Sequence, residues 1–388
     1  MNSFSGVDFY AVDRLLTDEE RLVRDSVREF VDRRILPIIA SCCREERFPT
    51  ELVPELAELG LLGASLKGYE CAGLGPVAYG LALQELERGD SAIRSFVSVQ
   101  GSLAMYAIYA HGEEAQKARW LPAMARGEKI GCFGLTEPDF GSNPAGLQTT
   151  AVRRGGEYVL NGNKMWITNG SIADVAVVWA REEGEMRGFL VERGAPGFST
   201  SLVKGKWSLR ASVTSGLHLQ DCRIPLENRL PNAKGLRGPL SCLNQARYGI
   251  SWGAIGAAMA CYAEALEYAK TRVQFNKPIA SFQLVQAKLV DMLAAITKAQ
   301  LLAWRLGRLK EAGEDRPEQT SLAKRENVAM ALEIAREARD ILAASGITDE
   351  YQCGRHMANI ESVYTYEGTH NIHTLILGQE ITGIAAFS

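Results

Sequence analysis

A glutamate near the end of the chain, Glu367, lies between Tyr366 and Gly368 in an aromatic-rich segment. An apolar, aromatic setting disfavours the charged form of a carboxylate, so the pKa of Glu367 is predicted to rise. A raised pKa suits a general base that works near neutral pH. The neighbouring glycine would let a ligand approach the backbone closely. A single loop glutamate is more often a solvated carboxylate, so the rest of the chain must decide between the two interpretations.

Two segments in the middle of the chain could hold a flat, polar ligand. Residues 131–142 combine small residues, hydroxyl side chains and a turn, which would expose backbone N–H groups and the Thr136 hydroxyl. Residues 164–169 contain Trp166 and Thr168, which could stack on a ring system and hydrogen-bond to its edge. Taken alone, each segment could equally reflect packing inside a β-domain.

Metal and disulfide chemistry are both disfavoured. His370 and His373 are one helical turn apart, but no Asp or Cys nearby completes a ligand set, so we predict no metal site. The eight cysteines are scattered without a C-x-x-C pair. A chain of this length needs no disulfide framework, so we expect reduced thiols in a cytosolic-type compartment.

Composition excludes several function classes. The chain is 46% hydrophobic and 23% charged, which is typical of a soluble globular protein. A net charge of -3 gives no basic footprint for nucleic acid, and no apolar stretch approaches the roughly 18 residues of a membrane helix. The first 20 residues resemble neither a secretory signal nor an Arg-rich transit peptide. We expect a cytoplasmic bacterial protein, or a mature eukaryotic chain in the mitochondrial matrix.

The elements that must position these residues begin with helices. A capping box at Thr17–Glu20 starts an apolar stripe that ends near Pro37. Helical periodicity recurs at 51–62, 77–88 and 102–111. The first third of the chain is therefore predicted to be helical.

The middle of the chain changes character. From about residue 131 to 229 it is rich in Gly, Thr and Val and in short alternating runs. Asn161–Gly162 and Asn169–Gly170 have the composition of turns between strands. Strands without intervening helices argue against a βαβ fold. An antiparallel β-domain is the prediction.

Long apolar-striped segments return at 254–272, 283–312 and 322–344. Helices of this length in tandem favour a four-helix bundle, which is often the core of an oligomer. The predicted fold class is α+β, with an N-terminal α-helical domain at 1–130, a middle antiparallel β-domain at 131–235 and a C-terminal four-helix bundle at 236–388.

Four motifs follow one another in a fixed order: F-G-L-T-E-P with a later G-S, then W-I-T, then R-x-Q-F-x-x-P at 272–278, then Y-E-G-T. With the α–β–α order, they make the chain resemble the acyl-CoA dehydrogenase family from about residue 15 to the end. Within that family the chain most resembles glutaryl-CoA dehydrogenase, on the segments 86–95, 243–250 and 365–387.

The resemblance implies an FAD cofactor between the β-domain and the C-terminal bundle. Positions that match flavin contacts are Phe133, Leu135, Thr136, Ser142, Trp166, Thr168, Thr369 and Asn371. Arg272, Phe275 and Gln283 match positions that reach the FAD of a neighbouring subunit, which implies a homotetramer.

The resemblance also implies an acyl-CoA substrate. Glu367 matches the base that removes the α-proton, and the acyl-CoA channel positions are Ser142, Asn244, Arg247, Tyr366 and Gly368. An arginine is usually a surface residue, but Arg94 matches the guanidinium that pairs with the distal carboxylate of glutaryl-CoA, with Ser95 and Glu87 as polar partners. The implied reaction is oxidative decarboxylation to crotonyl-CoA and CO2, with electron-transfer flavoprotein as acceptor.

Departures from the family pattern leave alternatives open. Ala343 and Ala344 stand where glycines are usual, which is unfavourable if those positions need a positive φ or a close approach to the FAD pyrophosphate. Ile93, Tyr364 and Asn371 also differ from the nearest relatives. The alternatives are another short-chain or dicarboxylic thioester, on CoA or a carrier protein, a flavin-dependent oxidase, a non-catalytic binding relative, or a plain helical scaffold without a ligand.

Overall fold

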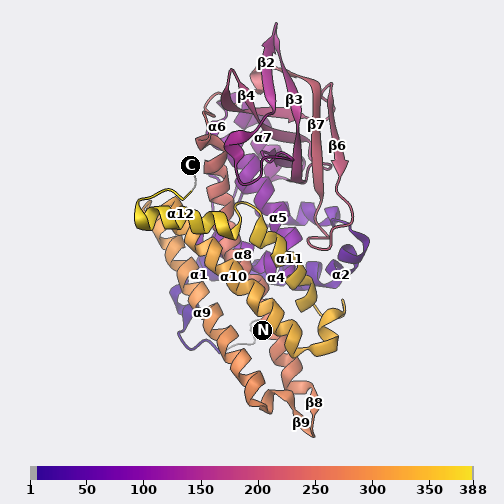
Figure 1. Cartoon of the computed structure of the whole chain (residues 1–388), viewed down its shortest axis with the longest axis vertical. Coiled ribbons are helices and arrows are strands. Elements are labelled where there is room, and N and C mark those ends of the chain that lie inside the picture. Colours follow the sequence, from indigo (N-terminus) through magenta and orange to yellow (C-terminus); the bar gives the residue numbers. More distant parts are fainter. Residues whose placement is uncertain (1–6, 387–388) are drawn as a thin grey trace.

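Helices form both ends of the chain and a sheet forms its middle (Figure 1). The computed structural model describes residues 7–386. The predicted order of helices, strands and helices is confirmed, and with it the α+β fold class. The N-terminal α-helices are α1 (Asp18–Phe30), α2 (Leu36–Glu45), α3 (Val53–Glu58), α4 (Pro76–Gly89), α5 (Ser91–Ser98), α6 (Tyr106–His111) and α7 (Glu114–Ala125).

The first helix begins at the predicted capping box. The Thr17 hydroxyl accepts from the Glu20 N–H at 3.2 Å, and the Glu20 carboxylate accepts from the Thr17 N–H at 2.8 Å. Pro37, however, does not mark the end of this helical run. A π-helical turn at Val31–Ile35 leads directly into α2, where Pro37 occupies the first turn. The Leu36 N–H before it bonds to the Val31 carbonyl in the π-helical pattern, so the missing N–H of Pro37 falls at the junction where the hydrogen-bonding pattern changes.

The middle of the chain forms one seven-stranded sheet in the order β1-β4-β2-β3-β7-β6, with β5 beside β4. Most neighbours are antiparallel, as predicted, but β1 runs parallel to β4 and so does β2. The β2–β3 hairpin is inserted between β1 and β4 in the sequence, so the chain returns in the same direction. The strands are β1 (Gly131–Gly134), β2 (Thr150–Arg154), β3 (Glu157–Thr168), β4 (Val175–Glu182), β5 (Glu185–Glu192), β6 (Phe198–Leu202) and β7 (Thr214–Pro225).

One of the two predicted turns in this region is wrong. Asn161–Gly162 lies inside β3, where the pairing with β7 shifts register between Leu160 and Gly162. A Cβ at Gly162 would lie 2.3 Å from the Thr149 hydroxyl oxygen, so glycine serves close packing at a bulge rather than a turn. Asn169–Gly170 does end β3, and Asn169 has a φ of 66°.

The C-terminal part contains the predicted four-helix bundle. It is built from α8 (Arg237–Thr271), α9 (Gln283–Glu311), α10 (Pro317–Ile341) and α11 (Cys353–Thr365), and α12 (His370–Thr382) follows. Helix α8 begins at Arg237, well before residue 254, where the sequence predicted its start. Helix α8 packs on one side against α10 and on the other against α4, so it is the central helix of the molecule. A short hairpin, β8 (Val273–Gln274) with β9 (Lys277–Pro278), joins α8 to α9.

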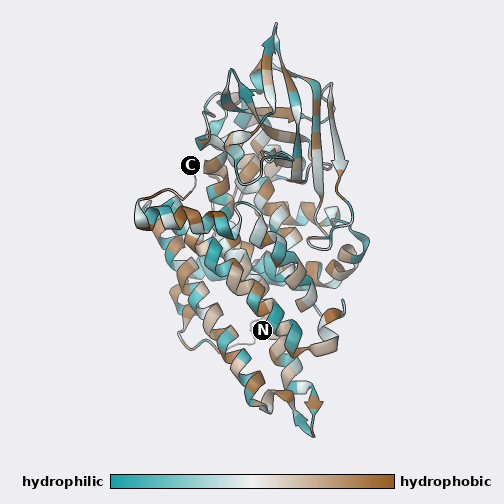
Figure 2. Ribbon diagram, in the orientation of Figure 1, coloured by the Kyte–Doolittle hydropathy of each residue, from teal (hydrophilic) through white to brown (hydrophobic). Residues whose placement is uncertain are grey.

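Burial follows the helical period. Helix α9 buries Leu289, Met292, Ile296, Ala299 and Ala303, which form a single stripe. Figure 2 shows hydrophobic and hydrophilic residues interspersed along such outer helices. Each fully buried aliphatic side chain stabilises the fold by roughly 1.5–3 kcal/mol.

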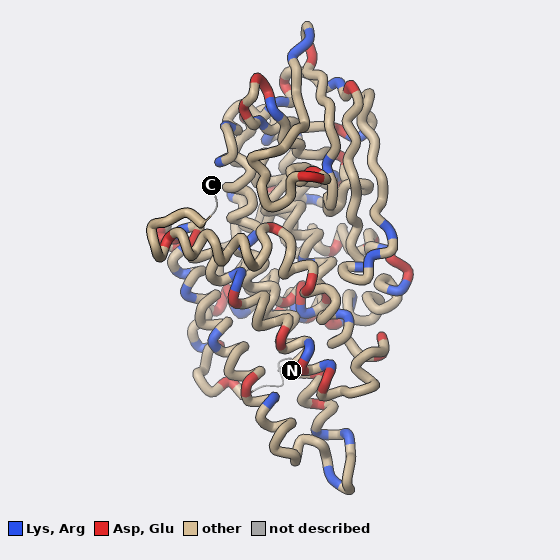
Figure 3. The backbone as a smooth tube through the Cα atoms, viewed as in Figure 1, with Lys and Arg blue, Asp and Glu red and all other residues tan. Residues whose placement is uncertain are grey.

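Charged residues of both signs are distributed over the helical and sheet regions in the same view (Figure 3). Among the described helices, none combines the length and apolarity that crossing a membrane would require.

Candidate functional site

Glu367 lies in the short turn between α11 and α12. The backbone there takes two successive left-handed conformations, with φ 51° at Glu367 and 93° at Gly368. Gly368 suits this conformation, and a Cβ there would lie 2.8 Å from His373 Nε2. Glu367 has a side chain, so its left-handed backbone costs about 1–2 kcal/mol. Such strain persists only where the surroundings hold it, and it is concentrated at functional sites.

The Glu367 carboxylate is poorly solvated and has no direct partner. Its Oε2 is buried and makes no hydrogen bond among the described residues. Burial raises the pKa of Glu367, and the positive charges of Arg94, Arg247 and Lys324 offset part of that rise. The sequence predicted the direction of this shift. A carboxylate with an unpaired oxygen and a raised pKa is able to take up a proton near neutral pH.

Two cations hold the backbone of this turn. Arg247, on α8, donates from Nε to the Glu367 carbonyl oxygen at 2.7 Å. Lys324, on α10, donates to the carbonyl oxygens of Tyr366 at 3.1 Å and Gly368 at 2.8 Å. Asn244 lies half-buried on α8, one turn before Arg247. Sequence analysis did not identify Lys324, although it occupies the buried stripe of α10 with Thr320 and Asn327.

Arg94 is a core residue, with an exposed fraction of 1%. This excludes the alternative that Arg94 is a surface arginine. Its Nε donates to Glu87 Oε2 at 2.6 Å, and its Nη2 donates to Glu87 Oε1 at 3.3 Å and to the Tyr366 hydroxyl. Ser95 Oγ lies 3.3 Å from the same hydroxyl oxygen. The structure therefore brings together Arg94, Ser95 and Glu87, the three residues predicted for a carboxylate pocket. Tyr366, which precedes Glu367 in the chain, lies against them.

Close packing of α4 on α8 makes this ion pair possible. A Cβ at Gly253 of α8 would lie 1.9 Å from Glu87 Oε2, so a larger residue would displace the carboxylate. Ser91 donates a further hydrogen bond to Glu87 Oε1 at 2.7 Å. Buried charges are tolerated when they are paired and hydrogen-bonded in this way. The Glu87 carboxylate outweighs the effect of burial and keeps the pKa of Arg94 above its ordinary value.

Two tyrosine hydroxyls border the same group of charges. The Tyr79 hydroxyl oxygen lies 2.7 Å from Ser102 Oγ, a buried pair that sequence analysis missed. Burial raises the pKa of Tyr79 to about 12, and it does the same for Tyr366. Both hydroxyls therefore stay neutral and available as hydrogen-bond donors at physiological pH.

The predicted flavin positions of the β-domain lie side by side. The Met165 N–H donates to the Thr136 carbonyl at 2.9 Å, which joins the loop after β1 to the end of β3. Trp166 is 60% exposed at a φ of 64°, an uncommon backbone for an aromatic residue, and Thr168 is half-buried at the end of the same strand. An exposed indole held at a strained bulge offers a flat face to a ring ligand.

The other predicted positions in this loop differ in exposure. Phe133 and Leu135 are buried in the core beside Trp179, so only their backbone groups can face a ligand. Ser142 is exposed on the loop that follows.

A buried ion pair fixes the loop against the strand. Lys164 donates to Glu137 Oε1 at 2.8 Å and to the Leu135 carbonyl at 3.2 Å. Glu137 also accepts from the N–H groups of Gln148 at 2.6 Å and Thr149 at 2.9 Å. Burial lowers the pKa of Lys164 to about 8. The ion pair anchors both segments that carry the predicted flavin contacts.

The remaining predicted cofactor positions divide into two groups. Thr369 caps α12, because its hydroxyl accepts from the Ile372 N–H at 3.1 Å, and Asn371 is exposed beside it. Arg272, Phe275 and Gln283 lie at the β8–β9 end of the molecule, opposite the sheet (Figure 1). One chain therefore does not bring these last three residues to the Trp166 surface.

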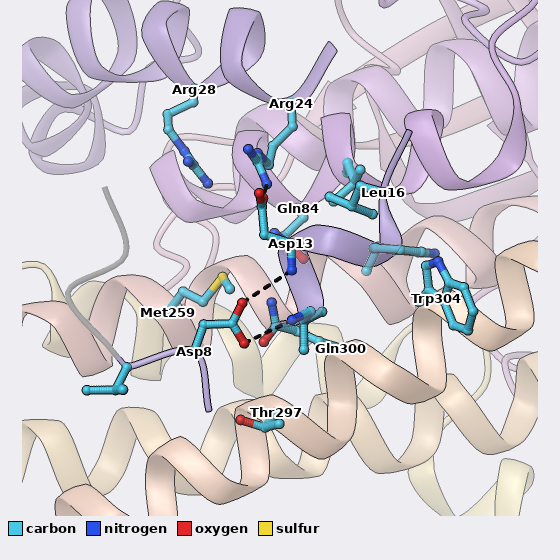
Figure 4. A pocket seen from close by; sticks show the side chains of 14 residues that line it. Asp8, Asp13, Leu16, Arg24, Arg28, Gln84, Met259, Thr297, Gln300 and Trp304 are labelled. Atoms are coloured by element: carbon cyan, nitrogen blue, oxygen red, sulfur yellow. Dashed lines mark hydrogen bonds and ion pairs between the residues drawn. The ribbon is translucent and has the colours of Figure 1, made fainter. Parts of the chain in front are cut away.

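Neither of two cavities borders Glu367. One, of about 220 Å³, lies between the N-terminal segment and α1, α4, α8 and α9 (Figure 4). Its Arg24 is already paired with Asp13 and Asp25. The other, of about 510 Å³, is bordered by Trp207 and Gly346 and lies next to the segment that carries Ala343 and Ala344.

The two histidines near Glu367 have different surroundings. His373 is fully buried, and neither ring nitrogen makes a hydrogen bond among the described residues. His370 stacks on Tyr364, with ring centroids 4.6 Å apart. Across the described part of the chain, no group of three or more His, Cys, Asp or Glu side chains is placed to hold a metal ion.

Ala343 occupies a backbone position that favours glycine, with a φ of 51°, whereas Ala344 does not have a positive φ. We expect Ala343→Gly to raise the free energy of unfolding by up to about 1 kcal/mol, because relief of the left-handed strain exceeds the entropic cost of glycine. Ala344→Gly is the matched control and should lower the free energy of unfolding by about 0.5–1 kcal/mol. Urea unfolding measures both, and equal destabilisation by the two changes would contradict the strain at Ala343.

Three family models match successive parts of the chain. Residues 17–128 match the N-terminal domain of acyl-CoA dehydrogenases, residues 132–222 the middle domain and residues 233–382 the C-terminal domain.

Individual relatives align along nearly the whole chain. The mitochondrial short-chain specific acyl-CoA dehydrogenase of Rattus norvegicus is 35% identical over 369 residues, covering 93% of this chain and 90% of the relative. A crystal structure of glutaryl-CoA dehydrogenase from Mycobacterium smegmatis is 59% identical with a TM-score of 0.96, covering 97% of both chains. A second, a glutaryl-CoA dehydrogenase from the same organism in complex with FADH2, is 53% identical with a TM-score of 0.97, covering 98% of both chains. The chain therefore belongs to the acyl-CoA dehydrogenase family.

Proposed function

We propose that this protein is an FAD-dependent dehydrogenase that oxidises glutaryl-CoA and decarboxylates it to crotonyl-CoA, with Glu367 as the base. The observation that carries the proposal is the buried Arg94, held by Glu87 and hydrogen-bonded to the tyrosine that precedes Glu367. Two hydrogen bonds from Nε and Nη2 tie this planar guanidinium to Glu87 and hold it in one orientation. Among the described residues Nη1 of Arg94 makes no hydrogen bond, so it remains free for a substrate carboxylate.

The balance of charge around Glu367 supports a dicarboxylic substrate. Three cations and two carboxylates share this region, which leaves one net positive charge when all are ionised: Arg94, Arg247, Lys324, Glu87 and Glu367. The distal carboxylate of glutaryl-CoA would neutralise that charge, whereas an uncharged acyl chain would leave it buried and uncompensated.

The residues present fit an FAD cofactor. The exposed Trp166 face, the Thr136 and Thr168 hydroxyls and the anchored loop after β1 form a surface suited to a flavin ring. The relative of known structure with FADH2 has the same fold at 53% identity. The chemistry that bound FAD supplies there is acceptance of the hydride from the β-carbon of the substrate.

The turn itself can perform the proton transfer. The Glu367 carboxylate takes the α-proton of the thioester, and its raised pKa matches that task. Neither the Glu367 nor the Gly368 N–H donates a hydrogen bond within the described structure, so the turn has free donors for the thioester carbonyl. Such donors stabilise the developing enolate. After oxidation the bond to the distal carboxylate breaks, CO2 leaves, the conjugated thioester takes the electron pair and Glu367 returns a proton to the γ-carbon.

We also propose that a second copy of the chain completes the cofactor site, as part of a homotetramer. Arg272 and Gln283 lie at the far end of the chain from Trp166, as a contribution to a neighbour requires. Large apolar side chains are exposed around that end and along the bundle: Phe275 at 86%, Leu284 at 81% and Ile381 at 82%. Large apolar side chains left exposed in a single chain can be covered by a neighbouring copy.

A second candidate function is oxidation of a short, uncharged acyl-CoA. It is favoured by the 35% identity to the short-chain specific enzyme. Both functions require an electron acceptor, for which we propose electron-transfer flavoprotein. Production of peroxide without any acceptor protein would instead identify an oxidase.

Anaerobic mixing of the FAD-loaded protein with glutaryl-CoA, and separately with butyryl-CoA, tests the proposal. We expect flavin bleaching with glutaryl-CoA and crotonyl-CoA and CO2 as products, detected by absorbance and mass spectrometry. Bleaching with butyryl-CoA alone would support the short-chain function and remove Arg94 from substrate binding. Bleaching with neither compound would reject both functions.

A further inference from the structure

Lys324 is a fully buried lysine without a carboxylate partner. Its exposed fraction is 1%, and within the described structure it forms no ion pair. Burying an ammonium group is costly unless hydrogen bonds compensate. Its Nζ bonds instead to the carbonyl oxygens of Tyr366 and Gly368. Burial lowers the pKa of Lys324 to about 7, and the Glu367 carboxylate offsets part of that shift, so near neutral pH the charge of Lys324 depends on the ionised Glu367, to which it makes no hydrogen bond.

The carbonyls of three successive residues are held by two cations from different helices. Lys324 binds the outer two carbonyls, and Arg247 binds the carbonyl of Glu367 between them. The turn needs such restraint because both Glu367 and Gly368 have positive φ. Hydrogen bonds from α8 and α10 therefore restrain all three carbonyls of the turn.

The charge of Lys324 acts on a defined set of neighbours. The ionisable groups that face it are the Glu367 carboxylate in the turn, Arg247 on α8, Arg94 on α5 and the imidazoles of His370 and His373 on α12. Glu367 is the only anion in this set, so ionisation of Glu367 and protonation of Lys324 favour each other. Tyr79 and Tyr366 also face Glu367, as neutral hydroxyls.

We propose that Lys324 is a positioning residue for the base: it clamps the Glu367 turn through two carbonyl oxygens, and its charge stabilises the ionised carboxylate while Oε2 stays free to accept a proton. The inference rests on the proposed function of Glu367. A lysine hydrogen-bonded directly to the carboxylate would occupy the oxygen that must take the proton. Binding the backbone instead lets the cation favour ionisation without blocking that oxygen.

Three variants separate the clamp from the charge. Lys324→Met removes both, Lys324→Gln keeps a hydrogen-bond donor and removes the charge, and Lys324→Arg keeps both. Arg325→Met is the matched control, because it removes a cation from the next residue of α10, where the side chain is only partly buried. Circular dichroism and bound FAD content establish that each variant is folded.

The first readout is the ionisation of Glu367 itself, followed by infrared difference titration and assigned by its loss in Glu367→Gln. We expect Lys324→Met and Lys324→Gln to raise the pH midpoint of Glu367 by about one unit. Lys324→Arg and Arg325→Met should leave it near the wild-type value. This measurement needs no substrate, so it tests Lys324 even if the proposed reaction fails.

The second readout is the pH profile of flavin reduction by the acyl-CoA that the wild type oxidises. The acid limb should move to higher pH in Lys324→Met and Lys324→Gln, and the plateau rate should fall further in Lys324→Met because the clamp is also lost. An unchanged Glu367 midpoint and acid limb in folded Lys324→Met and Lys324→Gln would overturn the proposal and leave Lys324 a packing residue. Wild-type protein that oxidises no acyl-CoA would instead reject the proposed function.

Discussion

Replacing Glu367 with glutamine is expected to slow flavin reduction by acyl-CoA at least about 10³-fold. The amide has the shape of the carboxyl group but cannot accept the α-proton. The change removes a single charge from a position where Oε2 has no partner among the described residues, so folding and FAD binding should persist. Stopped-flow absorbance of the FAD-loaded variant measures the effect, and flavin content after gel filtration measures cofactor retention.

The control for this variant is Glu361→Gln on α11. It makes the same chemical change close by in the sequence, at a carboxylate that is paired with Arg336 near the surface. We expect wild-type rates for the control. Flavin reduction by Glu367→Gln within tenfold of wild type would remove Glu367 from the role of base.

In the wild type, the rate should also fall as the pH is lowered. In the proposed reaction the ionised form of Glu367 acts as the base, and burial raises the pKa of Glu367 in the folded protein above the ordinary value. Lowering the pH through that raised pKa protonates the base, so the acid limb lies at a higher pH than for a solvated glutamate.

Replacing Arg94 is expected to separate dicarboxylic from uncharged substrates. Arg94→Ala should lower kcat/KM for glutaryl-CoA by about 10²-fold or more, because the buried substrate carboxylate loses its charged partner. The loss for butyryl-CoA should be less than about tenfold, since that acyl chain has no distal charge to pair. Steady-state kinetics with both substrates measure the difference, and equal losses would remove Arg94 from substrate recognition.

Arg94→Ala also leaves Glu87 buried without its partner, which destabilises a protein by about 3–5 kcal/mol. A double variant, Glu87→Gln with Arg94→Gln, removes both charges and avoids that unpaired carboxylate. It should show the same preference for the uncharged substrate. Arg88→Ala is the control, because Arg88 also pairs with a glutamate of α4, Glu85, at 2.7 Å, outside the Glu367 site. Arg88→Ala should change kcat/KM for glutaryl-CoA and for butyryl-CoA by the same factor.

The elements of this protein follow largely from local patterns. Helical and strand periods, the capping box at Thr17 and the turn at Asn169 were all predictable, because each depends on neighbours within one or two turns of chain. The same holds for the rise in the pKa of Glu367, since the residues beside it in the sequence already indicate an apolar setting. The matching of Glu87, Arg94 and Ser95 to one pocket came from family resemblance. The structure brings these residues together and adds the Tyr366 hydroxyl to them.

Other features depend on contacts between distant segments. Gly162 has the composition of a turn, yet packing against Thr149 places it inside a strand, and β1 lies parallel to β4 because a hairpin is inserted between them. Nothing beside Lys324 in the sequence indicates that its ammonium binds a turn more than 40 residues later. The sequence by itself determined the elements and the candidate base, because backbone propensity and side-chain period act locally. Only the tertiary structure decided which charges surround that base, because burial and pairing arise when separate helices pack together.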